Sequence, residues 1–357
     1  MVINAPLVKK LFKNPAKTAE IADLEYADDS QLTIQRHRHG RGFYYTRRGK
    51  KIRSKRTLKR IKSLVIPPAW ENVRISHLKN SHIQVKGTDD QNRLQYIYHP
   101  LWSKLRNQTK FAKMTAFGNV LPEIRKQVEL DLKLPTMSRR KCLALILRLM
   151  EETHIRIGSD YYAKKNKSYG LTTLRSKHLD IYKDNIKFTF TGKRGIEHTK
   201  TIRDKKLLKL VQQCEEIPGW QLFKYYDEHG AHHTIDSGMV NEYIRELSGE
   251  LFSAKDFRTW AGSKIFFENL YKIGPEDDEK QAEKNILTAY DTVAEALGNT
   301  RSVCRQYYVH PFINSSYLDK KITPYFQRLT DNQYPDNGLV STERAMLDLI
   351  GKYRIEL

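Results

Sequence analysis

Long apolar runs are absent from this 357-residue chain. No stretch approaches the roughly 20 apolar residues that span a bilayer, and the N-terminus lacks the apolar region of a signal peptide. Cysteine is scarce, because only Cys142, Cys214 and Cys304 occur and no two of them form a Cys-x-x-Cys pair. This usage indicates neither a disulfide framework nor a zinc site. We therefore expect a soluble, intracellular protein with no metal and no membrane partner.

Acidic residues are too few to balance the basic ones. The chain has 63 Lys and Arg against 41 Asp and Glu, a net charge of +22 that favours a polyanionic partner. From Arg36 to Lys62 there are thirteen Lys or Arg and no acid, and three aromatic residues, Phe43 to Tyr45, interrupt them. Such a stretch is typical of nucleic-acid binding. It can also be a disordered basic arm, but the strand-like run at 42–46 favours a positively charged sheet edge.

Local patterns divide the chain into two parts. Residues 1–99 hold strand-like runs at 42–46, 83–85 and 94–98, and a short run at 57–64 that predicts a helix. We expect these residues to form a small β-rich N-terminal domain that binds DNA.

Helical patterns dominate residues 100–357. Apolar side chains within 143–150 recur at the spacing of one helix face, and a later helical pattern stops at Gly298, a residue typical of a helix C-terminus. Between them, alternation of apolar and polar residues over 179–202 predicts a three-stranded antiparallel sheet. The acidic stretch 274–283 is expected to be a linker. The expected fold class is α+β, with a larger, mostly helical domain that carries this sheet.

Four residues of the second part are ordinary one by one. Arg156 and Arg258 would usually pair with acids, Lys193 would be a solvated turn lysine, and Tyr308 is one of twenty tyrosines. Together they are the parts that metal-free phosphodiester transfer needs. Guanidinium groups hold the non-bridging oxygens, a lysine protonates the departing 5′ oxygen, and a tyrosine hydroxyl, with an ordinary pKa of about 10, is a good leaving group on resealing. Such chemistry requires neither ATP nor another cofactor.

These residues resemble those of the type IB DNA topoisomerases, in the compact form found in bacteria and poxviruses. The resemblance covers about residues 42–311. It is carried by Ile-Arg-Ile-Gly around Arg156, by Gly-Lys at Lys193, by Lys-Asp-Phe-Arg-Thr around Arg258 and by Tyr-Val-His-Pro at Tyr308. The resemblance implies that these four residues are catalytic and that residues 100–357 form the catalytic domain.

The resemblance implies roles for further residues. Lys255 would assist catalysis, and Asn299, where the poxvirus proteins have a histidine, would donate to a non-bridging oxygen without adding charge. The two domains would close around duplex DNA like a clamp. Gln84 and Lys86 would then face a groove, and Tyr162 would touch DNA from the catalytic side.

The activity so implied is relaxation of positive and negative supercoils through a 3′-phosphotyrosyl intermediate. The enzyme would act as a monomer in the cytoplasm, on the nucleoid if the cell is bacterial. Two alternatives stay open. A tyrosine recombinase or integrase uses the same residue types, but it usually has His-x-x-Arg where this chain has Lys255-x-x-Arg258. A DNA-binding protein without catalysis would explain the charge but would not need Tyr308.

Overall fold

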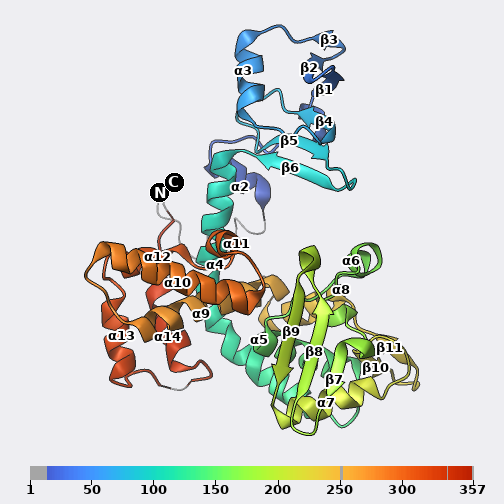
Figure 1. The fold of residues 1–357 in the computed structure, drawn as a ribbon, viewed down its shortest axis with the longest axis vertical. Coiled ribbons are helices and arrows are strands. Elements are labelled where there is room, and N and C mark those ends of the chain that lie inside the picture. Colours follow the sequence, from blue (N-terminus) through green and yellow to red (C-terminus); the bar gives the residue numbers. More distant parts are fainter. Residues whose placement is uncertain (1–13, 250–251, 336, 356–357) are drawn as a thin grey trace. The chain divides into compact units, whose positions relative to one another are not determined.

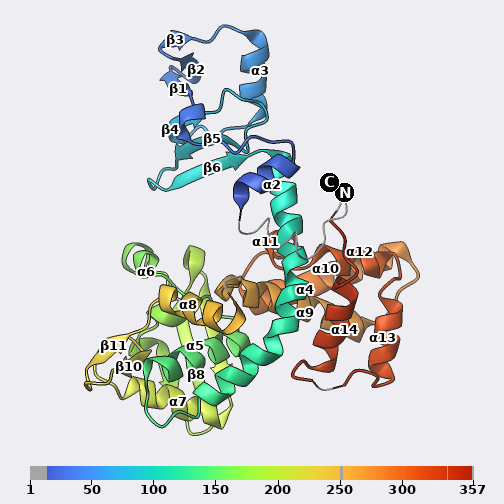
Figure 2. The ribbon, with the colours of Figure 1, turned by 180° about the vertical axis from the view of Figure 1, so that it is seen from behind.

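The computed structural model describes residues 14–249, 252–335 and 337–355 (Figures 1 and 2). The chain divides into two compact units. One takes in the residues up to Lys113 and those from Arg354 on, and the other is Met114–Tyr353. The division falls inside helix α4 (Pro100–Asp131), and the predicted boundary between residues 99 and 100 stays a prediction.

The first unit is built on a six-stranded antiparallel sheet in the order β3-β2-β1-β4-β5-β6. Its described elements are α2 (Pro15–Ile21), a 3-10 turn (Asp29–Gln31), β1 (Ile34–His39), β2 (Gly42–Arg47), β3 (Lys50–Lys51), α3 (Lys55–Ser63), β4 (Glu71–Ile75), β5 (Ile83–Thr88) and β6 (Leu94–Tyr98). One apolar cluster joins the sheet to α3, through Ile34, Ile61, Val73, Ile75 and Val85. The strand-like runs of the sequence are therefore confirmed as strands of one β-rich unit.

Helix α3 begins two residues before the predicted start. The side chain of Ser54 accepts a hydrogen bond from the backbone N–H of Thr57 at 3.4 Å and so caps the first turn. The polar residues at the start of this helix carried no apolar periodicity from which that turn could be predicted.

The second unit is mostly helical. It holds the rest of α4, then α5 (Arg139–Thr153), α6 (Asp160–Asn166), β7 (Leu179–Ile181), β8 (Ile186–Thr191), β9 (Glu197–Ile202), α7 (Lys205–Glu215), β10 (Lys224–Tyr226), β11 (His232–Thr234), α8 (Ser237–Ser248), α9 (Ala254–Ile273), α10 (Glu279–Leu297), α11 (Arg301–Tyr307), α12 (Pro311–Leu318), α13 (Thr323–Thr330) and α14 (Ser341–Ile350). Strands β7, β8 and β9 form the predicted antiparallel sheet. The expected α+β class is confirmed.

Helix α5 is the central helix of this unit. It packs against α7, α8, α9 and the sheet strand β9. Apolar residues from Cys142 to Met150 are buried all round the helix, more than the single apolar stripe of the sequence indicated. Packing on several sides therefore fixes the end of α5, and Arg156, the first of the predicted catalytic residues, lies three residues beyond that end.

Helix α10 ends as predicted and begins earlier than predicted. Gly298 adopts a left-handed conformation, with φ of 58°, and closes the helix. At the other end, Asp278 accepts a hydrogen bond from the backbone N–H of Gln281 at 2.7 Å. The second half of the acidic stretch 274–283 is therefore the first turn of α10 and not a linker.

Candidate active site

Backbone hydrogen bonds to a neighbouring segment fix the position of Arg156. Its carbonyl accepts a hydrogen bond from the N–H of Leu171 at 2.9 Å, and the carbonyl of Ile157 accepts one from Thr172 at 2.8 Å. The two segments approach so closely that a Cβ added at Gly170 would lie 2.6 Å from the backbone nitrogen of Gly158. A glycine is required there because no side chain fits.

Asn299 meets Arg156 from the end of α10. One guanidinium nitrogen of Arg156, Nη2, donates to Oδ1 of Asn299 at 2.6 Å. The backbone N–H of Asn299 donates to the carbonyl of Ala294 at 2.9 Å. Two predicted site residues that lie 143 positions apart in the sequence are therefore in direct contact.

Arg258 is the most buried of the predicted site residues, with 5% of its surface exposed. It lies in α9, donates to the carbonyl of His154 and, at 2.9 Å, to the carbonyl of Leu297. Its Nε is buried without a partner among the described residues. Burial, assisted by the charge of Arg156, lowers the pKa of Arg258 to about 10, so the guanidinium stays charged at neutral pH.

Tyr308 follows the last residue of α11, beside Arg258. The guanidinium carbon of Arg258 lies 5.3 Å from the centroid of the Tyr308 ring. The carbonyl of Tyr308 accepts a hydrogen bond from the hydroxyl of Ser263 at 3.1 Å, and its N–H donates to the carbonyl of Cys304 at 2.9 Å. The neighbouring Tyr307 is more exposed, and the role of Tyr308 as the nucleophile stays a prediction.

One pocket of about 270 Å³ gathers the remaining predicted residues. Lys193 enters it from the tip of the β8–β9 hairpin and Lys255 from the first turn of α9. None of its lining residues is acidic; they are Arg156, Lys193, Arg194, Ile196, Lys255, Gly298, Asn299, Thr300, Val303, Tyr307 and Tyr308. A cationic pocket of this kind suits a phosphodiester.

Two histidines and a lysine beneath this pocket were missed by sequence reasoning. Burial and the surrounding cations lower the pKa of His154 and of His198 to about 4. Burial and Arg258 also lower the pKa of Lys200, whose Nζ donates to the carbonyl of Ala296 at 2.9 Å. The lowered pKa values reflect burial first and, second, the cations gathered at this site. No motif in the sequence marked these residues.

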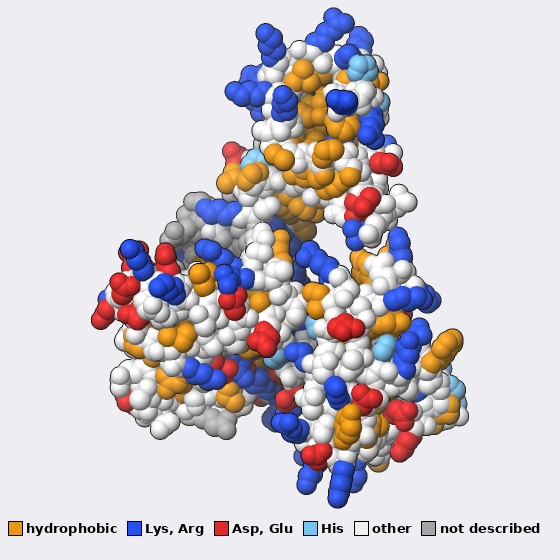
Figure 3. Space-filling view, in the orientation of Figure 1, with side chains coloured by type: hydrophobic (Ala, Val, Ile, Leu, Met, Phe, Trp, Pro, Cys, Tyr) orange, Lys and Arg blue, Asp and Glu red, His pale blue; other side chains and the backbone are white. Residues whose placement is uncertain are grey.

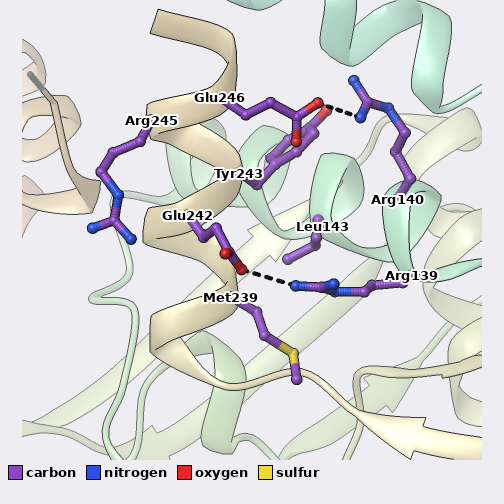
Figure 4. A pocket seen from close by; sticks show the side chains of 8 residues that line it. All are labelled: Arg139, Arg140, Leu143, Met239, Glu242, Tyr243, Arg245 and Glu246. Carbon is purple, nitrogen blue, oxygen red and sulfur yellow. Dashed lines mark hydrogen bonds and ion pairs between the residues drawn. The ribbon is translucent and has the colours of Figure 1, made fainter. Parts of the chain in front are cut away.

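A larger pocket, of about 600 Å³, lies elsewhere, between α5 and α8 (Figure 4). Two of its three lining arginines are paired with its two acids. Arg139 pairs with Glu242 at 3.0 Å, and Arg140 pairs with Glu246 at 2.6 Å. This pocket contains none of the predicted site residues, and its paired charges make it a poor anion site.

The predicted DNA contacts of the first unit need a correction at Gln84. Its side chain is 3% exposed. The amide donates to the carbonyls of Lys79 and Ser81, at 3.0 and 2.7 Å, and accepts from Arg60 at 2.9 Å. Gln84 is therefore a buried hydrogen-bonding residue that does not face a groove.

Two other predicted DNA contacts lie at the surface. Lys86 is paired with Asp29 at 2.6 Å. Tyr162, in α6, is 48% exposed and packs edge-on against the ring of Tyr161. Their roles as DNA contacts stay predictions.

The surface of the first unit carries a feature that was missed. Tyr96 and Tyr98 on β6 are 39% and 40% exposed, and their rings stack with centroids 5.8 Å apart. Lys and Arg side chains crowd the region of β1 to β3 and α3 (Figure 3). Alternation along 94–98 suggested the strand, but only the pairing of β5 with β6 decides which of its residues face solvent.

Two other kinds of site are absent from residues 14–249, 252–335 and 337–355. No group of three His, Cys, Asp or Glu side chains is placed to hold a metal ion. None of the helices in this part of the chain combines the length and the apolar character of a membrane span.

Two protein-family models match the chain. The model described as "Eukaryotic DNA topoisomerase I, catalytic core" matches residues 101–327, more than half of the chain. The model described as "Bacterial DNA topoisomerase IB, N-terminal domain" matches residues 42–89.

Viral proteins are similar over most of their length. A protein named DNA topoisomerase 1B from Acanthamoeba polyphaga mimivirus is 32% identical over 275 residues, which cover 75% of this chain and 81% of the relative. A protein of the same name from vaccinia virus (strain Copenhagen) is 26% identical over 257 residues, 70% of this chain and 76% of the relative.

Proposed function

Since this chain belongs to the type IB DNA topoisomerases, in the compact form of bacteria and poxviruses, we propose that it relaxes supercoiled duplex DNA by cutting and resealing one strand through Tyr308. The observation that carries the proposal is the convergence of the predicted side chains. Arg156, Lys193, Lys255, Asn299 and Tyr308 line one pocket, and Arg258 lies against the Tyr308 ring.

Cleavage begins with attack of the Tyr308 hydroxyl oxygen on phosphorus. The new bond is the Tyr308 oxygen to phosphorus, and the broken bond is phosphorus to the 5′ oxygen. Lys193 gives its proton to that oxygen, and the tyrosine proton leaves to solvent. Arg156 and Arg258 stabilise the charge of the phosphorane, and each such donor is worth ~2.7–4 kcal/mol of barrier. Religation is the reverse reaction, in which the 5′ hydroxyl attacks the 3′-phosphotyrosyl bond.

Asn299 and Lys255 support this transfer in different ways. Asn299 accepts from Arg156 through Oδ1 at 2.6 Å and donates one amide N–H to the carbonyl of Leu297 at 3.4 Å, so its second amide N–H is left to donate to a non-bridging oxygen. Lys255 is exposed at the N-terminus of α9 and adds a cation beside the same oxygens. Because an amide does not titrate, we expect Asn299 to add no pH dependence to cleavage.

Duplex DNA is the proposed partner, bound by both parts of the chain. Residues 1–99 would contact it through the exposed Tyr96 and Tyr98 and the basic strands, and residues 100–357 would contact it through Tyr162. We propose that a monomer does this, in the cytoplasm or on the nucleoid of a bacterial cell.

The test is relaxation of supercoiled plasmid by the purified protein in excess EDTA and without ATP. Tyr308→Phe is the decisive variant, and Tyr307→Phe, which also removes a hydroxyl from the pocket lining, is the matched control. We expect relaxation by the wild type and by Tyr307→Phe, and none by Tyr308→Phe. Relaxation by Tyr308→Phe would refute the assignment of the nucleophile.

A recombinase would behave differently in the same experiment. It would form a covalent tyrosyl complex on an oligonucleotide duplex but join strands of two duplexes instead of changing plasmid linking number. A protein that bound DNA tightly yet gave neither product would fit the non-catalytic alternative.

A further inference from the structure

His198 is wedged between two glycines of the active site. It lies on β9 opposite Phe190 of β8, and the two rings stack with centroids 5.3 Å apart and planes inclined by 23°. A Cβ added at Gly192 would lie 2.6 Å from Nε2 of His198, and one added at Gly298 would lie 2.9 Å from Nδ1, closer than real Cβ atoms come. The imidazole therefore fills the space that side chains at both glycines would take.

Each of these glycines directly precedes a predicted catalytic residue. Gly192 is followed by Lys193 at the hairpin tip, and Gly298 is followed by Asn299 in the segment that leads to Tyr308. Two backbone bonds close the hairpin tip, from the N–H of Gly192 to Ile196 at 2.7 Å and from the N–H of Gly195 to Gly192 at 3.2 Å, and both lie within the tip. Lower on β9, Lys200 donates to the carbonyl of Ala296 in α10 at 2.9 Å, which joins the strand to α10 but leaves the tip beside Lys193 to be placed by packing.

We propose that His198 is a positioning residue, whose imidazole holds the hairpin of Lys193 at a fixed place relative to the Asn299–Tyr308 segment. The inference rests on the proposed function, in which Lys193 is the general acid. Lys193 has an exposed side chain on a hairpin tip, so packing at the base of the hairpin decides where its ammonium lies. Ring contacts with Gly192 and Gly298 supply that packing.

The charge state of His198 suits this role. Burial, with the cations Arg156, Lys200 and Arg258 nearby, lowers the pKa of His198 to about 4. The ring is therefore neutral at physiological pH and acts through its shape. An imidazolium would add a further cation to a pocket that already holds several.

The test uses the leaving group. A 5′-bridging phosphorothiolate replaces the departing oxygen by sulfur, and because a thiol has a pKa of about 8.5 against about 15.7 for water, the sulfur leaves without a proton. Single-turnover cleavage is measured on normal and sulfur duplexes that carry the same cleavage site. The cleavage rate of Lys193→Ala should be about 10²–10⁴-fold below that of the wild type on the normal duplex. On the sulfur duplex its rate should return to near the wild-type value. Arg156→Ala should be slow on both.

His198→Ala should show the same pattern as Lys193→Ala, with slow cleavage of the normal duplex and rescue on the sulfur duplex. A misplacement of 1 Å costs about 10²-fold, so we expect a loss of about 10²-fold on the normal duplex and cleavage close to wild type on the sulfur duplex. Thr201→Ala, an exposed position on the same strand, should match the wild type on both. His198→Phe, which keeps a flat ring against Phe190, should restore most of the rate on the normal duplex.

Gly192→Ala gives an independent check, because its methyl group would push the ring away from the hairpin. It should show the same rescue by sulfur. Equal losses on both duplexes for His198→Ala and Gly192→Ala, with Lys193→Ala rescued, would overturn the positioning role alone. Failure of Lys193→Ala to be rescued would overturn the general-acid role of Lys193 and, with it, this inference.

Discussion

Replacing Glu343 should destabilise the second unit more than any surface change. Glu343 lies in α14 and is 1% exposed. Its carboxylate accepts hydrogen bonds from Arg125 at 2.7 and 2.9 Å and from the indole N–H of Trp260 at 2.9 Å. The cluster joins α14 to α4 and to α9, the helix of Arg258.

The expected loss of unfolding free energy follows from the hydrogen-bond donors of Arg125 and Trp260 that lose their acceptor. In Glu343→Gln the amide N–H₂ would face the N–H groups of Arg125 or Trp260, so at least one donor loses its acceptor and Arg125 loses a counter-charge. Breaking a buried pair in this way costs about 3–5 kcal/mol. Arg125 keeps Glu151, at 3.0 Å, so we expect the lower figure, about 3 kcal/mol. At about 2–4 °C per kcal/mol for a unit of this size, the Tm should fall by about 6–12 °C.

Thermal unfolding followed by circular dichroism measures this change. Glu283→Gln, at an exposed position of α10, is the control and should leave the Tm within about 2 °C. Arg125→Met combined with Glu343→Leu should recover much of the loss, because two well-packed apolar residues leave no charge unpaired. A Tm for Glu343→Gln within about 2 °C of the wild type would refute the reasoning.

The pH dependence gives a second test of the same cluster. Burial alone would raise the pKa of Glu343, but the hydrogen bonds and charge of Arg125 outweigh burial and hold the pKa below its usual 4.5. The stabilisation is therefore complete above pH 4.5 and is lost as the pH falls through the lowered pKa. The difference in Tm between the wild type and Glu343→Gln should shrink accordingly at acid pH.

Three other predictions concern the site and the first unit. Arg258→Lys should slow cleavage about 10²–10³-fold, measured in single turnover, since an ammonium cannot reproduce the planar fork that meets the carbonyls of residues 154 and 297. The pKa of His154 falls from 6.5 to about 4 on folding, so its contribution is complete above pH 6.5 and lost as the pH drops toward 4. Asparagine tolerates the left-handed backbone at this position (φ 56°). In urea unfolding, the free energy of unfolding should fall between pH 7 and pH 4.5 by up to about 3 kcal/mol less in His154→Asn than in the wild type. Gln84→Leu should cost about 1–3 kcal/mol by leaving buried partners unpaired, yet keep the salt dependence of DNA binding; a shallower slope of log K against log salt would mean that position 84 does contribute to phosphate binding.

The sequence alone determined the elements whose patterns are local. The alternation over 179–202, the glycine that closes α10 and the strand run at 94–98 are consequences of neighbouring residues, and each is confirmed. The motifs also identified five residues that line one pocket in the structure, although the separate roles of these residues stay predictions. These features could be predicted from the sequence because the period of a strand or the cap of a helix depends on a few adjacent positions.

Only the tertiary structure decided which residues far apart in the sequence contact or bury one another. It buries Gln84 against Arg60, places Arg258 between the carbonyls of residues 154 and 297, and sets His198 between two glycines more than 100 positions apart. Burial and close contact depend on which segments pack together, and periodicity carries no information on that. The sequence therefore predicted which groups react, while packing fixed the surroundings of those groups.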